Sequence, residues 1–284
     1  MNKKRLSIGR GASKTTVYTV CILLALLSVI PFWIMFINAT RNTPEISNAQ
    51  LSLLPSTHIM HNWNVFVTKP TFNPITGFIN SLLISTGATA LAVYFSSLTA
   101  YGIVAYTWRA RKAFFGFIMA IMMIPAQLFV IGFYQFMYKI GLNNNLLALI
   151  LPSIAAPAVV FFMRQYLLST LSVDMVEAAR IDGSNEFRTF NRIVLPIMKP
   201  AIATQAIFSF VTSWNALFMP MVLLTKPNLF TMPIMVSLLR GDIYKQELGS
   251  IYLGLAITAL PLFIIYFLFS RYIIRGIALG GVKE

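Results

Sequence analysis

The chain has 284 residues, of which 57% are hydrophobic and only 11% are charged. A soluble globular domain carries about 25% charged residues, so this composition excludes a soluble fold and predicts an integral membrane protein. The net charge of +14 would favour nucleic-acid binding in a soluble protein. In a membrane protein it reflects the Lys and Arg of inner loops and their attraction to anionic lipid, so we expect membrane lipid as a partner and no nucleic acid.

Six apolar runs are long enough to cross a bilayer, which takes about 20 mostly apolar residues. The first, residues 17–38, follows a basic segment of residues 1–16. It is longer than a signal-peptide core and no cleavage site follows it, so we interpret it as a retained span. The others are residues 78–106, 113–137, 146–168, 201–224 and 250–274. The sequence therefore predicts an all-α polytopic membrane protein with six transmembrane helices.

Prolines lie inside several of these runs. Pro152 and Pro157 interrupt the fourth run. Pro31, Pro125 and Pro261 are expected to kink their helices without breaking them, because neighbouring helices can satisfy the freed carbonyls.

Six spans place both termini on the same side of the membrane. If the N-terminus is inside, 16 of the 22 Lys and Arg residues lie in inner segments and 6 in outer ones. Since Lys and Arg of short loops accumulate on the cytoplasmic side, we expect the first segment (1–16) and the tail (275–284) to be cytoplasmic. Residues 39–77 and 225–249 then form external loops.

Several kinds of chemistry are missing. None of the eight Asp and Glu residues falls within the six runs, which argues against a transporter driven by a proton or sodium gradient. The dipeptide Gly-Lys never occurs, so the chain contains no phosphate-binding loop of the G-x-x-x-x-G-K-[ST] type. His58 and His61 stand three residues apart without a further Cys or His near them, which favours surface histidines over a metal site. We expect no catalytic residue, no metal and no cofactor.

One segment between the fourth and fifth apolar runs is rich in charged residues. This segment, residues 169–200, is called the charged loop below, and it lies in the cytoplasm in the predicted topology. Ser172 and Asp174 are typical of a helix start, and Asp182-Gly183 of a helix end, because Gly adopts the left-handed conformation readily. Ser184 is expected to cap a second helix.

The second helix of the charged loop has an apolar face. Phe187, Phe190, Ile193 and Val194 recur at three- and four-residue spacing, and Pro196 and Pro200 are expected to close the helix. From the residues alone, two alternatives remain open. The loop is either a solvated segment lying on the bilayer or a docking surface for another chain.

The text "EAARIDGS" at 177–184, followed by "IVLPIMKP" at 193–200, resembles the EAA signature of permease subunits of ATP-binding-cassette (ABC) importers. Every element of that signature is present: Glu177, Ala178, Ala179, Asp182, Gly183, Ile193, Pro196 and Pro200. Residues 80–106 resemble the start of that family's core domain. The segments "SWNALFMPMVLL" (213–224), "TMPI" (231–234) and "GIALGGVKE" (276–284) resemble its carbohydrate-uptake branch, and specifically the six-span maltose-type permease.

The resemblance implies a type I ABC importer permease fold with a core domain at 78–274, in a bacterial plasma (inner) membrane. It implies no enzyme activity in this chain. The implied partners are ATP-binding-cassette ATPase subunits, a second permease in a heterodimer, and an extracytoplasmic solute-binding protein. The loop residues implied to couple to the ATPase are Glu177, Ala178, Ala179, Arg180, Asp182, Gly183, Phe187 and Pro196.

Substrate contacts are harder to identify. Asn80, Trp214 and Asn215 are candidates, since aromatic rings stack on sugars and amides bind hydroxyls, although helix packing is the commoner role of such residues. The external loop 225–249 resembles a segment that reaches toward the binding protein, and its apolar run "FTMPIMVSLL" is expected to need a covering partner. The expected solute is a sugar or oligosaccharide. Glycerol phosphate or a peptide is the alternative, and an autonomous secondary transporter the less favoured one.

Overall fold

The structure is a computed structural model that describes residues 5–48, 52–68, 73–240 and 247–281. Over these ranges it is helical and contains no β-strand, so the all-α prediction is confirmed there. Two of the eight acids considered above, Asp242 and Glu284, lie outside the described residues. The contacts divide the described residues into two compact units. One is built from Met1–Pro70 and Leu238–Ile257, and the other from Thr71–Ser237 and Thr258–Glu284.

The first unit begins with a long apolar helix, α1 (Arg5–Asn38), which runs through Pro31 without a break. Its apolar side chains are exposed on every side between Val17 and Trp33. A helix that is apolar around its whole circumference and unburied by protein is a membrane span, because only lipid can cover such a surface.

Short helices follow α1. The helix α2 (Thr43–Ser47) starts with a capping box, in which Asn42 and Glu45 each accept a hydrogen bond from the other's backbone N–H. The bond from the Asn42 N–H holds the pKa of Glu45 below its ordinary value. The helix α3 (Ile59–Thr68) carries Asn62, which is fully buried.

Asn62 satisfies the carbonyl groups that follow the end of α1. Its Nδ2 donates to the carbonyls of Ala39 and Arg41, both at 2.9 Å. The Oγ of Ser250, in the first turn of α15 (Leu248–Gly281), donates to the Asn62 carbonyl at 3.1 Å. Gly249 lies so close to this junction that a Cβ there would come within 2.1 Å of the Arg41 carbonyl oxygen. The junction therefore requires glycine at 249.

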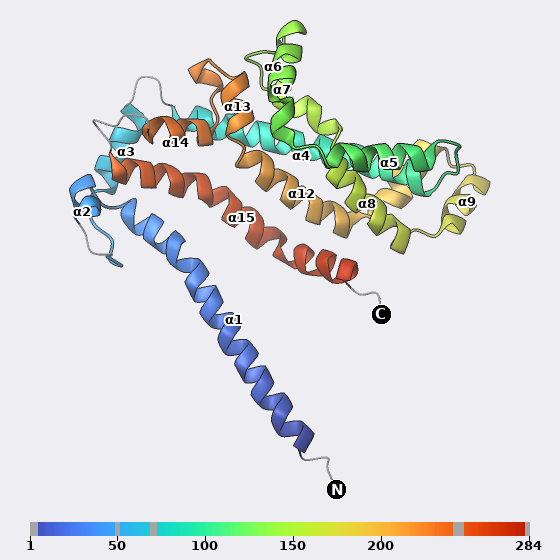
Figure 1. Cartoon of the computed structure of the whole chain (residues 1–284), viewed down its shortest axis with the longest axis horizontal. Helices are drawn as coiled ribbons and strands as arrows, with labels where there is room; N and C mark the ends of the chain where they lie inside the picture. Colours follow the sequence, from blue (N-terminus) through green and yellow to red (C-terminus); the bar gives the residue numbers. More distant parts are fainter. Residues whose placement is uncertain (1–4, 49–51, 69–72, 241–246, 282–284) are drawn as a thin grey trace. The chain divides into compact units, whose positions relative to one another are not determined.

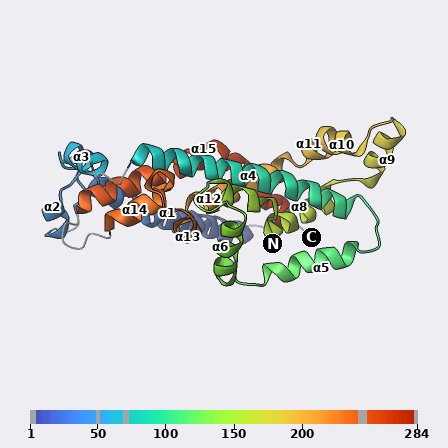
Figure 2. The same ribbon diagram turned by 90° about the horizontal axis from the view of Figure 1, so that it is seen from above.

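The second unit is organised around α4 (Pro74–Val104), which Asn73 caps by accepting from the N–H groups of Ile75 and Thr76. Figures 1 and 2 show α4 lying alongside α8 (Pro157–Thr170) and α12 (Lys199–Trp214). The face that α4 buries against its neighbours is rich in small side chains: Ser81, Ser85, Ala88, Ala92, Ser96, Ser97 and Ala100. Small residues let helix backbones approach closely, which is how helices associate inside a bilayer.

The remaining helices of this unit are short. They are α5 (Arg111–Met122), α6 (Val130–Lys139), α7 (Leu147–Ile150), α13 (Phe218–Leu223) and α14 (Met232–Arg240). Single 3₁₀ turns lie at Ala126–Phe129, Leu151–Ile154 and Pro227–Leu229.

By length and apolar composition, four helical segments could each cross a membrane: Lys14–Asn38, Pro74–Val104, Leu147–Thr170 and Leu248–Leu268. Two further pairs of helices qualify if each bent pair is counted as one span, which gives up to six. The prediction of six spans is consistent with this result, and Pro261 lies inside α15 without breaking it, as expected.

Besides the fourth run, which is interrupted at Ala155 and Ala156 as expected, two predicted spans are not continuous helices. Pro125 was expected to kink its helix, but α5 ends at Met122 and the chain turns by 87° before α6. The run 201–224 was expected to be one helix, but α12 ends at Trp214 and α13 begins at Phe218. Pro220 explains this second break, because its ring would clash with the carbonyl four residues earlier and it has no N–H to donate.

The Asn62 junction gives a test of the first unit. We expect Gly249→Ala to lower the melting temperature of the detergent-solubilised protein, because the new methyl group overlaps the Arg41 carbonyl and the Asn62 amide. The cost of such overpacking is about 1–3 kcal/mol. The matched control is Gly102→Ala in α4, where no atom lies within 4 Å of the added Cβ. An unchanged melting temperature for Gly249→Ala would contradict the junction.

Candidate functional site

The charged loop folds into two short helical segments joined by a tight turn. The first is α9 (Val173–Ile181), and the second is α10 (Glu186–Thr189), which continues through a π-helical turn (Phe190–Val194) into α11 (Leu195–Ile197). Gly183, between the two segments, has a φ of +76°, so the predicted glycine turn is confirmed. At such a φ any side chain is strained, which explains the glycine.

Two expected caps differ in the structure. Ser172 occupies the N-cap position of α9, but its side chain makes no capping hydrogen bond. Asn185, not Ser184, caps α10, and its Oδ1 accepts from the Arg188 N–H at 2.9 Å. The Ser184 hydroxyl instead accepts a hydrogen bond from Thr189 Oγ1 at 2.9 Å. Ser184 was predicted as the cap because it directly follows the glycine turn.

The expected end of the second helix is also wrong. Pro196 was expected to close it, but the helical segment runs through Pro196 to Ile197. Pro196 directly follows the π-helical turn Phe190–Val194, so the segment departs from regular α-helical hydrogen bonding just before the residue that lacks an N–H. The chain bends by 81° only at Met198, between α11 and α12, and Pro200 lies in the first turn of α12.

The three residues of the EAA signature do not share one environment. Glu177 and Ala178 are exposed, whereas Ala179 is buried with 6% of its surface accessible. Val176 is fully buried on the same side of α9. Both alanines were expected to allow close approach to a partner. The structure leaves only Ala178 available for that contact, because Ala179 packs within the chain.

The exposed side of the charged loop also carries large apolar side chains. Ile181 is 86% exposed and Phe187 is 67% exposed, near the turn at Gly183. Asp182 is exposed as well. Isolated apolar residues are common on surfaces, but two such groups beside a glycine turn and next to charged residues form a small exposed apolar surface.

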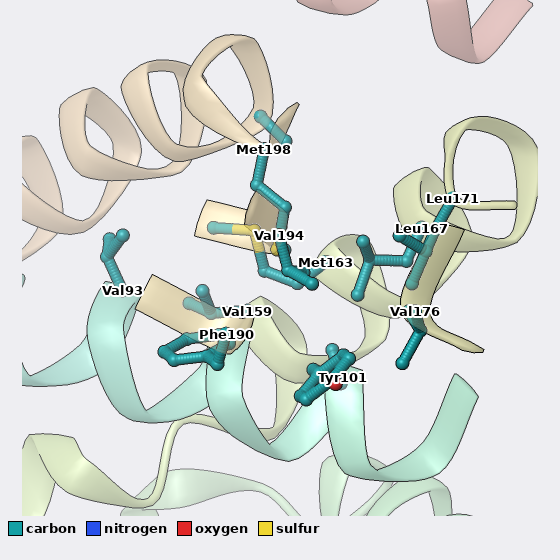
Figure 3. Close-up of a cluster of buried hydrophobic side chains, with 12 residues drawn as sticks. Val93, Tyr101, Val159, Met163, Leu167, Leu171, Val176, Phe190, Val194 and Met198 are labelled. Atoms are coloured by element: carbon teal, nitrogen blue, oxygen red, sulfur yellow. The ribbon is translucent and has the colours of Figure 1, made fainter. Parts of the chain in front are cut away.

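The opposite side of the charged loop is held by an apolar core. Figure 3 shows Phe190, Val194 and Val176 packed with Tyr101 of α4 and with Met163 and Leu167 of α8. Phe190 has no accessible surface, and its ring lies 5.7 Å from the rings of both Tyr94 and Tyr101. Burying a phenylalanine side chain stabilises a fold by about 1.5–3 kcal/mol, so this residue fixes the loop against the helices.

A polar cluster joins the loop to the chain that follows α4. The Glu186 carboxylate accepts hydrogen bonds from the Tyr106 hydroxyl and from Arg180 Nε, the latter at 2.9 Å. The bond from Tyr106, with that from Arg180, holds the pKa of Glu186 below its ordinary value. Glu186 is therefore ionised at neutral pH. Sequence reasoning missed Tyr106, because nothing in the local text pairs residues 80 positions apart.

The candidate substrate contacts are mostly engaged within the chain. Asn80 is buried, and its Nδ2 donates to the carbonyls of Asn228 and Phe230 at 3.0 and 3.1 Å. Trp214 is 1% exposed, its Nε1 donates to the Thr258 carbonyl at 2.9 Å, and its ring contacts Phe78 and Phe210. Asn215 is exposed at the end of α12. Helix packing therefore accounts for two of the three.

The apolar run of the external loop does not need the covering partner that was expected for it. Met232, Ile234 and Met235 of α14 have at most 2% of their surface accessible. The Met232 N–H donates to Ser81 Oγ at 2.9 Å, and a Cβ at Gly77 would touch the sulfur of Met235. The run is thus covered by α4 of the same chain, a long-range contact that the local pattern could not indicate.

The two histidines differ in their surroundings. His58 lies in a polar cluster, with its Nδ1 3.1 Å from Ser56 Oγ and 3.5 Å from a carboxylate oxygen of Glu45. His61 is exposed. Over the part of the chain that the structure describes, no three His, Cys, Asp or Glu side chains gather as a metal site would require.

An open cavity of about 570 Å³ lies beside the break between α5 and α6. Phe129, Phe133, Pro152 and Met219 are among its lining residues, which are all apolar. Such a cavity offers a sugar no side chain that could bind its hydroxyl groups.

Comparisons with known proteins agree with this architecture. The model of the family described as "Binding-protein-dependent transport system inner membrane component" matches residues 92–279. The arabinooligosaccharide transport system permease AraQ of Halalkalibacterium halodurans is 35% identical over 92% of this chain and 93% of its own. The lactose transport system permease LacG of Rhizobium radiobacter is 29% identical over 94% of this chain and 95% of its own.

A solved structure shares the fold. A chain from the crystal structure of a bacterial ABC transporter involved in the import of the acidic polysaccharide alginate superposes with a TM-score of 0.76. The identity is 20%, and the match covers 96% of this chain and 98% of the other. The type I importer fold implied by the EAA signature is consistent with this match. The chain belongs to the family of binding-protein-dependent transport system inner membrane components, and it is a multi-pass permease subunit of an ABC importer.

Proposed function

We propose that this permease imports a sugar or oligosaccharide and that its charged loop docks on a separate ATPase subunit. The single observation that carries the docking proposal is the two-sided loop. Glu177, Ala178, Ile181 and Phe187 are exposed on it, while Phe190 and Val176 are buried against the membrane helices. A partner that moved the exposed side would therefore displace α4 and α8 as well.

The docking surface has a definite chemistry. Glu177 supplies a negative charge for a basic group of the ATPase, and Ala178 allows its backbone to approach closely. Ile181 and Phe187 supply apolar anchors of the kind that dominate protein interfaces. Binding and hydrolysis of ATP in the partner then shift the permease between two states, because the partner's contacts differ between them.

Other partners follow from the family. The family description names transport that depends on a binding protein, which supports a solute-binding protein on the outer side. We propose a second permease chain that completes the translocation path, in a heterodimer with this one. The cavity beside α5 and α6 has only apolar lining residues, so we do not assign the sugar site to it. Asn215 is the one exposed residue among the three candidate contacts in this chain.

The names of several relatives support a sugar as the solute. They name arabinooligosaccharides, lactose and trehalose or maltose. One observation favours a second candidate, since two relatives at 26% and 27% identity are named as sn-glycerol-3-phosphate permeases. An autonomous secondary transporter is disfavoured because none of the four described helical segments long enough to cross a membrane alone contains an acidic residue to bind a coupling ion.

Charge reversal tests the docking proposal. We expect Glu177→Lys to insert normally but to lower ATP-driven uptake by about tenfold, in the range of typical coupling energies. Gly183→Val should have the same effect, because its φ of +76° strains any side chain. The measurement is uptake per transporter at equal membrane content. Gly116→Val is the matched control, since its added Cβ meets no atom within 4 Å and its backbone is helical. Normal uptake by both loop variants would refute the docking role.

A pair of lysines tests the proposed cytoplasmic location of the termini and of the charged loop. In a Cys21→Ser background, Lys112→Cys at the start of α5 should react with an impermeant thiol reagent only in inside-out vesicles. Lys139→Cys at the end of α6 should react in intact cells. Both lysines are exposed, so accessibility from the wrong side would reverse the topology.

A solute panel tests the sugar proposal. Vesicles with the complete transporter should take up arabinotriose, lactose, maltose or trehalose in an ATP-dependent way, and should not take up sn-glycerol 3-phosphate. Uptake of glycerol phosphate alone would favour the second candidate. Uptake by this chain alone, without ATPase subunits, would contradict an ATP-driven importer.

A further inference from the structure

We propose that Tyr106 and Glu186 form a clamp that makes the charged loop and the cytoplasmic end of α4 move as one body. Glu186 is a positioning residue in this proposal, and Arg180 serves the clamp and not the ATPase contact. The inference deepens the proposed function and rests on it, because it describes how movement of the docked loop reaches a helix to which the loop is not covalently joined.

The hydrogen bonds of the clamp meet at the carboxylate of Glu186. Glu186 Oε2 accepts from the Tyr106 hydroxyl, and the Tyr101 hydroxyl of α4 lies 3.4 Å from the same oxygen. The two tyrosine hydroxyls are 3.2 Å apart. Hydrogen bonds to an ionised carboxylate are roughly twice as strong as those between neutral groups. Tyr101 near the end of α4 and Tyr106 just after it thus direct two hydroxyl groups at one residue of α10.

Arg180 closes the cluster from the other side of the glycine turn. Its Nε donates to Glu186 Oε1 at 2.9 Å, and its guanidinium carbon lies 5.0 Å from the centre of the Tyr106 ring. This position satisfies the charge of Arg180 within the chain, through an ion pair and a cation–π contact. Arg180 joins α9 to α10 and both to Tyr106.

A second contact restrains the same two elements. The Tyr94 hydroxyl donates to Asn191 Oδ1 at 3.3 Å, two helical turns before Tyr101 on α4. Phe190 lies between the rings of Tyr94 and Tyr101, both at 5.7 Å. An apolar contact alone would let α4 slide along the loop. The polar contacts at both sides of Phe190 fix the register.

The clamp affects more than the loop, because α4 packs against the two helices that flank the loop. The loop is covalently continuous with α8 and α12, and α4 packs against both of these helices (Figure 2). Through the clamp the loop holds all three helices of this packed group. A displacement of the loop is therefore transmitted to the group as a unit, and α8 and α12 do not move separately around α4.

A distance measurement tests the clamp without any transported solute. In the complete transporter with Cys21→Ser, spin labels at Thr107→Cys and Arg188→Cys report the end of α4 and α10, which are both exposed. We expect this distance to be the same with and without ATP. A second pair, Arg188→Cys with Lys139→Cys on α6, should change on ATP binding. Adding Tyr106→Phe should broaden the first distance distribution or make it shift with ATP.

Coupling efficiency gives the functional readout. We expect Tyr106→Phe and Glu186→Gln each to raise the ATP hydrolysed per sugar imported by about threefold, the size of one interaction with a partly exposed charged group. The double variant should be no worse than the poorer single variant, because both remove the same bond. Tyr138→Phe is the matched control, since it removes an exposed hydroxyl on α6. Melting temperatures of all variants should equal that of the wild type.

The failures of the two proposals are distinguishable. If the Thr107–Arg188 distance changes with ATP in the wild type, or if the variants keep the wild-type ATP ratio, the clamp is refuted while docking stands. If the Arg188–Lys139 distance does not respond to ATP and Glu177→Lys has no effect, the docking proposal itself fails.

Discussion

The insertion of Phe190 between helices is the interaction on which the arrangement of the charged loop depends. Its ring has no accessible surface and lies between Tyr94 and Tyr101 of α4. A short charged segment outside the bilayer cannot fold by its own hydrophobic burial, because it has too few apolar residues to offset the entropy of ordering. Phe190, with Val176 and Val194, supplies that burial by using the ends of α4 and α8 as the other half of a core. One side of the loop is then free to bind a partner.

The existence of the membrane helices could be predicted from the sequence, but their continuity could not. Apolar runs of sufficient length locate the spans because every backbone group must be satisfied in lipid. Proline does not interrupt every helix that contains it. Pro31 and Pro261 lie within unbroken helices, whereas helices break near Pro125 and Pro220. Whether a proline breaks a helix depends on which neighbouring groups accept the freed hydrogen bonds, and that is a property of the packed structure.

The candidate site shows the same division between local and distant information. The Gly183 turn and the two flanking helices are set by residues within one or two turns, so local patterns predicted them. The burial of Ala179, the engagement of Arg180 by Glu186 and the covering of α14 by α4 each depend on residues brought together by folding. The loop's signature therefore indicated this segment as the candidate site, while the division of its residues between exposed and buried required the structure.

The length of α1 has a consequence for the membrane in which this permease works. Its span Lys14–Asn38 has 25 residues, which at about 1.5 Å per residue is about 37 Å long. The hydrocarbon layer is about 30 Å thick, so either the polar residues at the two ends of the helix reach the headgroup region or the helix tilts. Only 6% of the apolar stretch is buried by protein, so little in the chain resists such adjustment. Within this chain the first helix is thus able to adjust its tilt to the membrane, and a thicker membrane would accommodate it more upright.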